Sequence, residues 1–433
     1  MNNTLRRSLF YSTAMVSLMA AGSHGAMATS VIGGGSTLAY PTVNNLEFST
    51  ATKGGDFTYC SVGSGNGTSA FVSNTDTPLA TDTVNCNGLS GKAVDYGASD
   101  AFISSTNVTA FKTSANAGAL IQLPLFGTPV TFPFKLSGKT TNGSETLTEA
   151  QICGIFSGQI TDWHTIDSTI AAGTAITVGY RLDGSGTSFL LTNNLKSVCP
   201  GVNSSAFTST QLAAMPTTTF AASVFPAGVP TNFKGGTGSS GVQAIVLTTS
   251  NSVAYLSPDF TDISITGHAA GGPVVAKVTN HHDLLAYLPN VTNTSTALGT
   301  ITAPTGAAEK TQSNWAPVVA DPAHGYPVAG YTYWFLATCY NATNSAGVVT
   351  DLKSFLQQHY NITNSSIGRG LITDITNGGF VPVTGSTNTA NASAYAAAIN
   401  AAFLTGSDGQ GLNIANTGAG SANAACVSGV AGR

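Results

Sequence analysis

Five times along this chain, a short apolar run passes directly into glycines and hydroxyl residues. The five segments are Val31–Leu38, Tyr59–Thr68, Val94–Asp100, Thr177–Ser188 and Lys234–Val242. Each has the pattern of a strand that ends in a tight turn, and helix-like stretches lie between several of them. Alternating strands and helices through the first two thirds of a chain favour α/β units. With roughly 400 residues after the N-terminal segment, the length predicts two domains or more.

Individual elements follow from local patterns. Four apolar runs predict strands, at Thr58–Val62, Ala93–Gly97, Gly118–Leu125 and Ala175–Tyr180. Three segments predict helices: Thr148–Ser157, with Thr146 or Thr148 as its capping residue, Ser188–Val198, and the alanine-rich Ala390–Leu404. Stretches rich in Gly, Ser, Thr and Asn predict surface insertions or long loops at Thr292–Gln312 and Thr384–Asn391.

The N-terminal segment is typical of a secretory signal peptide, residues 1–28. Arg6 and Arg7 precede an apolar stretch, and Ala26-Met27-Ala28 supplies small residues for cleavage after Ala28. The arginine pair leaves the twin-arginine route open beside the general secretory route. No cysteine near the cleavage point is available for a lipid, and no later apolar run approaches the roughly 20 residues of a membrane span. We therefore expect an exported protein without a membrane anchor, periplasmic or secreted.

Six cysteines in an exported chain indicate disulfides. Six cysteines allow 15 pairings, and the sequence alone does not choose among them. We favour sequential pairing, because it keeps each bridge within one structural region: Cys60–Cys86, Cys153–Cys199 and Cys339–Cys426. A zinc site is disfavoured, because the chain has no Cys-x-x-Cys and no close Cys/His cluster.

Charged residues make up only 8% of the chain, against about 25% in ordinary soluble domains. Neutral polar residues must therefore cover most of the surface. The formal net charge of -4 provides no basic patch for a nucleic-acid partner.

The glycine-hydroxyl loops suit a small oxyanion. Glycines let the backbone approach a ligand closely, and the next helix presents unpaired N–H groups at the positive end of its dipole. Arg181 adds a planar donor fork, although pairing with Asp183 at a helix start is its structural alternative. Asp100, as a carboxylate, accepts a hydrogen bond from a protonated anion and disfavours one without a proton, such as sulfate. Taken singly, each loop is more typical of a turn or a helix cap.

Enzyme signatures are weak. No loop ends in the Gly-Lys-[Ser/Thr] of a nucleotide P-loop or forms a Gly-x-Ser-x-Gly nucleophile elbow. The chain also lacks paired carboxylates or histidines spaced for a two-metal phosphatase. We interpret the tight cluster His281-His282-Asp283 as a surface loop rather than a set of metal ligands. Ser64 or Thr187 remains a candidate nucleophile, without a visible adjacent base.

Taken in order, these segments resemble the phosphate-binding proteins of bacterial phosphate ABC transporters and the related DING proteins. The resemblance is carried by Gly33-Gly34-Gly35-Ser36-Thr37-Leu38, Gly63-Ser64-Gly65, Asp95-Tyr96-Gly97-Ala98-Ser99-Asp100 and Arg181-Leu182-Asp183-Gly184-Ser185-Gly186-Thr187-Ser188. Two further segments agree, the Leu147–Trp163 helix and the Ser252–Tyr255 strand. The stretch from Gly406 to Arg433 is not typical of the transporter proteins.

The resemblance implies an α/β, two-domain, type II periplasmic-binding-protein fold with its ligand cleft between the domains. Domain I would comprise residues 29–124 and 319–433, and domain II residues 125–318. Inorganic phosphate would bind to a monomer without metal or cofactor, and an ABC permease is the protein partner that the resemblance suggests. The phosphate contacts implied are Thr37, Leu38, Ser64, Asp100, Arg181, Ser185, Gly186 and Thr187.

Two alternatives stay open. A DING-type phosphatase would hydrolyse phosphomonoesters in the same cleft. An extracellular adhesion or binding protein on this fold would take a different ligand, and it would bind phosphate weakly or not at all. The preferred hypothesis is a binding protein rather than an enzyme.

Overall fold

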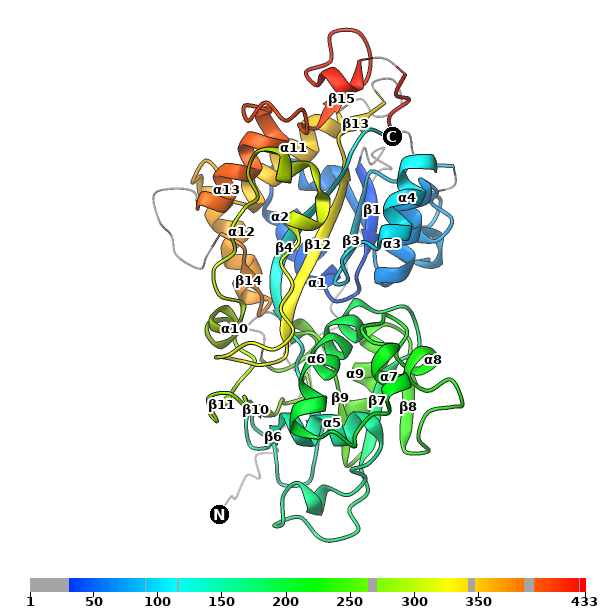
Figure 1. Ribbon diagram of the computed structural model, residues 1–433, viewed down its shortest axis with the longest axis vertical. Coiled ribbons are helices and arrows are strands. Elements are labelled where there is room, and N and C mark those ends of the chain that lie inside the picture. Colours follow the sequence, from blue (N-terminus) through cyan, green and yellow to red (C-terminus); the bar gives the residue numbers. More distant parts are fainter. Residues whose placement is uncertain are drawn as a thin grey trace, which may run out of the picture.

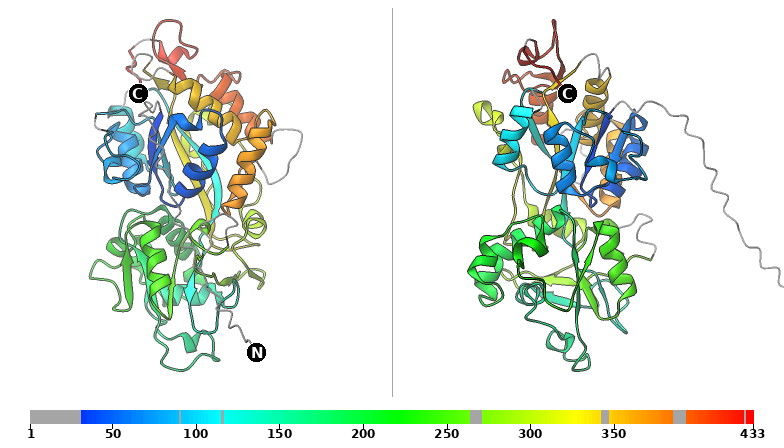
Figure 2. Two further views of the ribbon diagram at one scale, coloured as in Figure 1. Left: turned by 180° about the vertical axis from the view of Figure 1, so that it is seen from behind. Right: turned by 90° about the vertical axis from the view of Figure 1, so that its right-hand side faces the viewer.

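The computed structural model describes residues 31–89, 91–114, 117–263, 271–341, 347–384, 393–427 and 429–433. The predicted signal peptide, residues 1–28, lies outside this range. The described chain forms two α/β halves, one above the other (Figure 1), and the two views of Figure 2 show the same division. Each half has its own large hydrophobic cluster. The α/β class and the two-part architecture that the sequence predicted are confirmed.

The upper half is built on a mixed six-stranded sheet. Its strands run in the order β14 (Val381–Pro382), β4 (Leu120–Pro129), β12 (Ala329–Ala337), β3 (Tyr96–Ser99), β1 (Val31–Gly35) and β2 (Phe57–Cys60). Strands β1, β2 and β3 are parallel, whereas β12 and β14 run antiparallel to their neighbours. Every residue of β4 and β12 is buried, which explains their nearly continuous apolar sequence.

Helices cover both faces of this sheet. Helices α3 (Ser64–Ser73) and α4 (Ser105–Ser114) lie on one side, and α11 (Val348–His359), α12 (Ser366–Asn377) and α13 (Ala394–Ile399) on the other (Figure 1). The short helices α1 (Tyr40–Thr42) and α2 (Phe48–Thr50) follow β1. A two-stranded sheet of β13 (Cys339–Tyr340) and β15 (Ala415–Asn416) lies at the far end.

The lower half contains two smaller sheets. One has the order β5 (Phe134–Lys135), β9 (Ser252–Ala254), β7 (Thr177–Arg181) and β8 (Phe233–Gly236); the other has β11 (Ala286–Tyr287), β10 (Lys277–Thr279) and β6 (Thr146–Thr148). Its helices are α5 (Glu149–Ser157), α6 (Gly186–Val202), α7 (Ser209–Ala213), α8 (Phe220–Val224) and α9 (Gly238–Thr248).

Two neighbouring segments connect the halves. Strand β4 ends at Pro129. The Val130 N–H still donates to the Val328 carbonyl, just before β12, whereas the Thr131 N–H donates to the Leu256 carbonyl, just after β9 of the lower half, each over 2.8 Å. The returning segment passes Tyr326, whose hydroxyl donates to the Val130 carbonyl over 2.7 Å, and enters β12. The domain limits given from the sequence stay a prediction.

Helix ends match or correct the sequence predictions. Thr148, not Thr146, caps α5 through a capping box, in which its side chain accepts from the Gln151 N–H and the Gln151 side chain accepts in return. Helix α6 begins two residues before the predicted Ser188. The predicted Ala390–Leu404 helix is α13 followed by a π-helical turn, Asn400–Thr405; residues 390–392 lie outside the described residues.

The prediction of a surface insertion or long loop at Thr292–Gln312 was wrong for its first part. Helix α10 (Val291–Leu298) occupies its first part. The Asn290 side chain caps this helix by accepting from the Asn293 N–H over 2.9 Å, and Ala297 and Leu298 face the core. The polar composition predicted a loop, but the Asn290 cap and the buried face stabilise a helix instead. Of the other predicted loop, residues 385–391 lie outside the described residues.

The three sequential disulfides are present: Cys60–Cys86, Cys153–Cys199 and Cys339–Cys426. The last one holds the C-terminal stretch, which the resemblance left unexplained, against the upper half. Arg433 strengthens that attachment, because its guanidinium lies 4.1 Å from the centre of the Phe71 ring and its Nε donates to the Val94 carbonyl over 2.6 Å.

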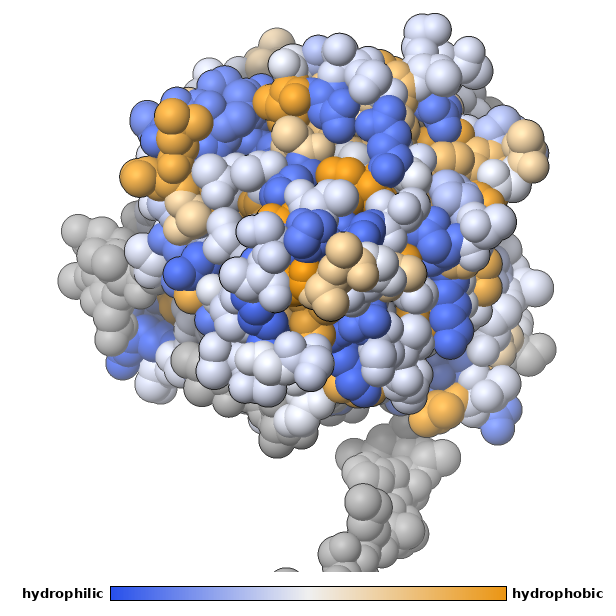
Figure 3. All heavy atoms as spheres, turned by 90° about the horizontal axis from the view of Figure 1, so that it is seen from below, coloured by the Kyte–Doolittle hydropathy of each residue, from blue (hydrophilic) through white to orange (hydrophobic). Residues whose placement is uncertain are grey.

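The surface agrees with the low charge content. The lower face shows hydrophilic and weakly polar residues with hydrophobic ones scattered among them (Figure 3). Among the described residues, no helix has the length and apolar character needed to span a bilayer.

Candidate functional site

The eight residues proposed from the resemblance lie where the two halves face each other. In the upper half, Thr37 and Leu38 follow β1, Ser64 is the first residue of α3, and Asp100 follows β3 directly. In the lower half, Arg181 ends β7, while Ser185, Gly186 and Thr187 form the start of α6. All eight are buried. They gather because the carboxyl ends of parallel strands meet at one edge of a sheet, which is where α/β proteins bind ligands.

Direct contacts join the two sets of loops. The Gly65 N–H donates to the Gly184 carbonyl over 3.3 Å, and the hydroxyls of Thr37 and Ser239 are hydrogen-bonded over 3.0 Å. A Cβ atom at Gly186 would lie 2.5 Å from the Asp100 carboxylate and 2.6 Å from the Ser64 hydroxyl. The structure therefore has the halves closed against each other, and Gly186 permits that approach because it lacks a side chain.

Asp100 is the centre of the upper part of the site. Its Oδ1 accepts hydrogen bonds from the hydroxyls of Ser36, over 2.7 Å, and Thr332, over 2.8 Å. Its backbone N–H donates to the Ser64 hydroxyl over 3.3 Å. Its Oδ2 is buried and has no hydrogen-bond partner among the described residues. One carboxylate oxygen is thus fixed by the protein, and the other is left for a donor from outside.

Burial raises the pKa of Asp100 to about 6, although the hydrogen bonds from Ser36 and Thr332 and the charge of Arg181 oppose the increase. Above that pH the side chain is ionised and can only accept hydrogen bonds. At neutral pH the free oxygen is therefore a buried acceptor that favours a ligand with an O–H group.

Arg181 is held by Asp183. Its Nε donates to Asp183 Oδ1 over 2.8 Å and its Nη2 donates to Oδ2, while Nη1 donates to the Ser239 hydroxyl over 3.2 Å. Burial opposes ionisation of Asp183, but the hydrogen bonds and charge of Arg181 outweigh it, so the pKa of Asp183 is lowered. The pairing that the sequence left as an alternative is present, and it orients the guanidinium with Nη1 toward Ser239 and Thr37.

Three helices begin at the site, α3 at Ser64, α6 at Gly186 and α9 at Gly238. Their first N–H groups and their dipoles favour an anion. The Ser185 hydroxyl caps α6 by accepting from the Ser188 N–H over 3.2 Å. The Thr187 hydroxyl is buried without a hydrogen-bond partner among the described residues. The site therefore contains a possible donor without a partner, the Thr187 hydroxyl, as well as the acceptor without a partner, Asp100 Oδ2.

Three further residues belong to the site. Ser36 and Thr332 hold Asp100, and Ser239 bridges Arg181 and Thr37. Ser36 and Ser239 stand within the first and fifth glycine-hydroxyl loops, so the pattern contained them but did not distinguish them. Thr332 lies in the middle of β12, 232 residues from Asp100 in sequence, and no local signal could have indicated it.

A cleft of about 700 Å³ opens beside the site. Ser64 and Thr68 of α3 line one wall, and Phe189 and Thr217 belong to the opposite side. The rings of Phe102 and Phe189 meet edge to face, with centroids 5.1 Å apart. Ser64 thus borders both the buried site and an open space large enough for a small organic group.

A family model described as "PBP superfamily domain" matches residues 20–355. The chain belongs to this superfamily of periplasmic binding proteins. Among curated relatives, "Alkaline phosphatase L" of Pseudomonas aeruginosa strain PAO1 is 33% identical over 399 residues, covering 90% of this chain and 93% of that protein. A "Phosphate-binding protein" of an unknown prokaryotic organism is 30% identical over 405 residues, covering 89% of this chain and 96% of that protein.

Solved structures place this PBP-superfamily chain among the DING and phosphate-binding proteins. The periplasmic phosphate-binding protein PfluDING, with bound phosphate, gives a TM-score of 0.71 at 30% identity, covering 89% of this chain and 96% of that one. The phosphate-binding protein of Stenotrophomonas maltophilia gives 0.69 at 31% identity, covering 87% and 94%. The suspected family is confirmed by these matches.

The raised pKa of Asp100 predicts a pH-dependent gain in stability for Asp100→Asn. A folded-state pKa of about 6 against the ordinary 3.8 means that ionised Asp100 costs the unliganded protein up to about 3 kcal/mol, at 1.36 kcal/mol per pKa unit. The stability that the parent gains from a neutral Asp100 is fully present below pH 3.8 and is lost as the pH rises through 6. An asparagine side chain at this position cannot ionise, so the variant should melt above the parent at pH 8 and near it at pH 4. Equal melting differences at both pH values would contradict this assignment.

Proposed function

We propose that this protein binds one inorganic phosphate ion in the buried site between its two halves. The observation that carries the proposal is the free Oδ2 of Asp100, a buried acceptor beside Arg181 and three helix N-termini. Phosphate near neutral pH has both the negative charge for the donors and an O–H group for Asp100. The eight predicted contact residues and Ser239 would surround it.

Selectivity follows from the same carboxylate. Sulfate has the same shape but no proton at neutral pH, so one of its oxygens would face Asp100 Oδ2 without a hydrogen between them. Leaving a buried charge unpaired typically costs about 2 to 5 kcal/mol, which corresponds to roughly 30-fold to several thousand-fold in affinity.

The relatives support the proposal, because a curated relative is called a phosphate-binding protein and the PfluDING structure contains phosphate.

Hinge closure would couple binding to a change of shape. The two connecting segments near Val130 and Val328 would bend, while Gly186 and Gly184 approach the Ser64 loop. The proposed domain limits are 29–124 and 319–433 for domain I and 125–318 for domain II, although residues 125–129 of β4 lie in the upper sheet. The predicted signal peptide would deliver the protein to the periplasm or the outside, where it would act as a monomer. Whether an ABC permease receives the phosphate stays a prediction, which the neighbouring genes would test.

A second candidate is hydrolysis of phosphomonoesters. It is favoured by the relatives called "Alkaline phosphatase L" and by the cleft beside Ser64, which would admit the organic part of an ester. Within the described part of the chain, the Ser64 hydroxyl accepts from the Asp100 N–H and has no histidine or carboxylate side chain hydrogen-bonded to it as a base. Release of p-nitrophenol from p-nitrophenyl phosphate, lost in Ser64→Ala, would support this function over simple binding.

Calorimetric titration of the mature protein tests the binding proposal. At pH 8 phosphate should bind with one-to-one stoichiometry and at least about 30-fold more tightly than sulfate. As the pH falls below about 6, the pKa of Asp100, the protonated carboxyl can donate to sulfate, so sulfate affinity should rise. Equal affinities at pH 8, or no phosphate binding at all, would refute the proposal.

Gly186→Ala tests the closed arrangement. The added methyl group would overlap Asp100 and Ser64, so the halves should not close and phosphate affinity should fall at least about tenfold, or 1.4 kcal/mol. With its halves apart, the unliganded variant has no such overlap, and Ala favours a helix over Gly, so it should keep the parent's melting temperature. Gly201→Ala is the matched control, because this glycine lies in the same helix with open space at its Cβ position. A parent-like phosphate affinity for Gly186→Ala would exclude this closed geometry.

A further inference from the structure

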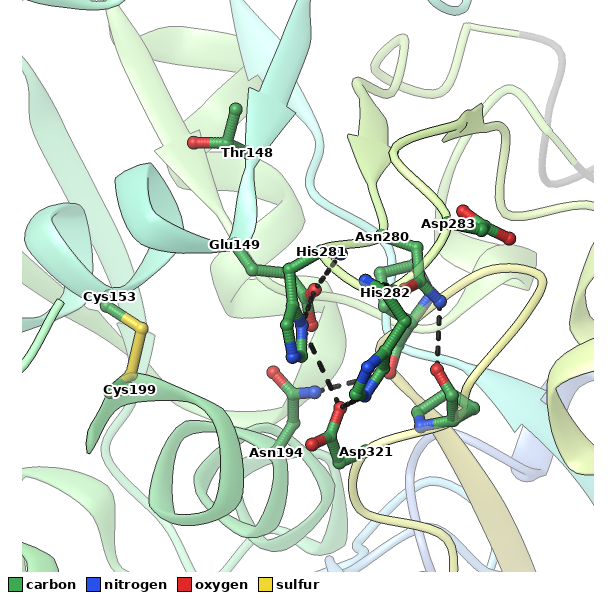
Figure 4. Close-up of polar contacts among 12 residues, drawn as sticks. Thr148, Glu149, Cys153, Asn194, Cys199, Asn280, His281, His282, Asp283 and Asp321 are labelled. Atoms are coloured by element: carbon green, nitrogen blue, oxygen red, sulfur yellow. Dashed lines mark hydrogen bonds and ion pairs between the residues drawn. A yellow bond between two sulfur atoms is a disulfide. The ribbon is translucent and has the colours of Figure 1, made fainter. Parts of the chain in front are cut away.

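We propose that His281, His282 and Asp321 form a binding site for a divalent transition-metal ion of the Zn²⁺ type, with Glu149 positioning His281. None of these residues belongs to the proposed phosphate site. His281 and His282 follow β10, Asp321 lies on the segment that returns to the upper half, and Glu149 is the first residue of α5 (Figure 4). The fold thus brings together three segments that are far apart in sequence.

The three side chains are already arranged around a common point. One ligand atom from each lies within 4.8 Å of the other two. The Nε2 atom of His282 is 3.0 Å from Asp321 Oδ1, and the His281 ring lies beside the same oxygen, with its Nδ1 atom 3.9 Å away. Because Nδ1 of His281 faces Glu149, its other ring nitrogen, Nε2, would be the metal ligand. Ligand atoms at about 2.0 to 2.2 Å from a tetrahedral ion are themselves about 3.3 to 3.6 Å apart, so side-chain rotations that shorten the longest of these distances would complete the set.

Glu149 provides the second, independent observation. This residue is 2% exposed, and its Oε2 accepts from the His281 backbone N–H over 2.8 Å and faces the His281 Nδ1 over 2.7 Å. Its Oε1 is buried without a hydrogen-bond partner among the described residues. Histidines that bind metals are commonly oriented by a carboxylate in this manner. Glu149 is thus placed to orient His281 as a metal ligand.

The backbone around the ligands is fixed. The Asn280 side chain is buried; its amide donates to the carbonyls of Pro322 and Gly325, over 2.9 and 3.2 Å, and its oxygen accepts from the His282 N–H over 2.8 Å. From α6, the Asn194 amide donates to the Ala320 carbonyl over 3.0 Å. The loop that carries the histidines and the segment that carries Asp321 are therefore held against each other before any ion binds.

The charge balance favours a cation. Within the described part of the chain, the ion pairs of the carboxylates Glu149 and Asp321 involve only His281 and His282. The two imidazole rings lie 3.9 Å apart between centroids, which is close enough for one ion to be shared between them. The side chains of His282 and Asp321 are 41% and 31% exposed, which leaves a path for the ion.

Asp283, the acid of the sequence cluster, is not part of this set. Its Oδ2 accepts from the Tyr287 hydroxyl over 2.7 Å and faces His324 Nδ1, while its Oδ1 accepts from the Leu285 N–H. The interpretation of His281-His282-Asp283 as a plain surface loop rested on those three neighbours alone. Asp321, 39 residues after His282, supplies the carboxylate instead.

Two imidazoles and one carboxylate suit Zn²⁺ better than Mg²⁺, which prefers oxygen ligands.

Calorimetry with ZnCl₂ on the mature, disulfide-bonded protein tests the site, after chelator treatment and in a phosphate-free buffer. The parent should bind one Zn²⁺ per chain with saturation, and MgCl₂ should give no saturable binding. The Asp321→Asn and His282→Ala variants should weaken Zn²⁺ binding at least about 100-fold, and Glu149→Gln should weaken it about 10-fold to 100-fold.

His324→Ala is the matched control, because this histidine is 72% exposed beside the same loop and contacts Asp283 rather than the proposed ligands. It should bind Zn²⁺ within a few-fold of the parent. The exposed Asp321→Asn substitution should keep the metal-free melting temperature, which separates loss of a ligand from loss of the fold. The proposal is overturned if the parent shows no saturable Zn²⁺ binding, if Asp321→Asn binds like the parent, or if His324→Ala loses as much affinity as Asp321→Asn.

Discussion

The functional site depends on one buried carboxylate. Asp100 is held by hydroxyls from the loop after β1 and from β12, and its N–H bonds to the first residue of α3. This is possible because β3 lies between β12 and β1 in the sheet. The same carboxylate faces Gly186 of the lower half. Asp100 is thus both an internal anchor of the upper half and the surface against which the lower half closes.

The arginine of the site is already paired with a carboxylate, Asp183. Arg181 and Asp183 together carry no net charge, and Asp100 adds a negative charge at neutral pH. Attraction for an anion must therefore come from oriented dipoles: the starts of α3, α6 and α9 and the hydroxyls of Thr37, Thr187 and Ser239. Such donors are directional, so they would select a ligand by the position of its oxygens and protons more than by its charge.

Local signals predicted much of this arrangement. The glycine-hydroxyl loops located Ser64, Asp100, Arg181 and the start of α6, because each function there depends on consecutive residues at a strand end. The cap of α5 at Thr148 was accessible for the same reason. The sequential disulfides join cysteines 26 to 87 residues apart and were favoured only because such pairing keeps each bridge within one structural region. Contacts between residues that are far apart in sequence could not be predicted from local signals. Thr332 reaches Asp100 only through strand pairing, and Asp321 approaches His282 only because the returning segment passes that loop. Helix α10 was missed because its polar composition hides a small buried face.

The claim that ionised Asp100 selects a protonated anion is tested most directly by the ratio of phosphate to sulfate affinity in Asp100→Asn, measured by calorimetry at pH 8 beside the parent. An amide can donate to sulfate through its nitrogen and still accept through its oxygen. The account predicts that the ratio, large in the parent, collapses toward unity in the variant, mainly through tighter sulfate binding. A variant that keeps the parent's ratio would contradict it, because selectivity would then arise elsewhere in the cleft.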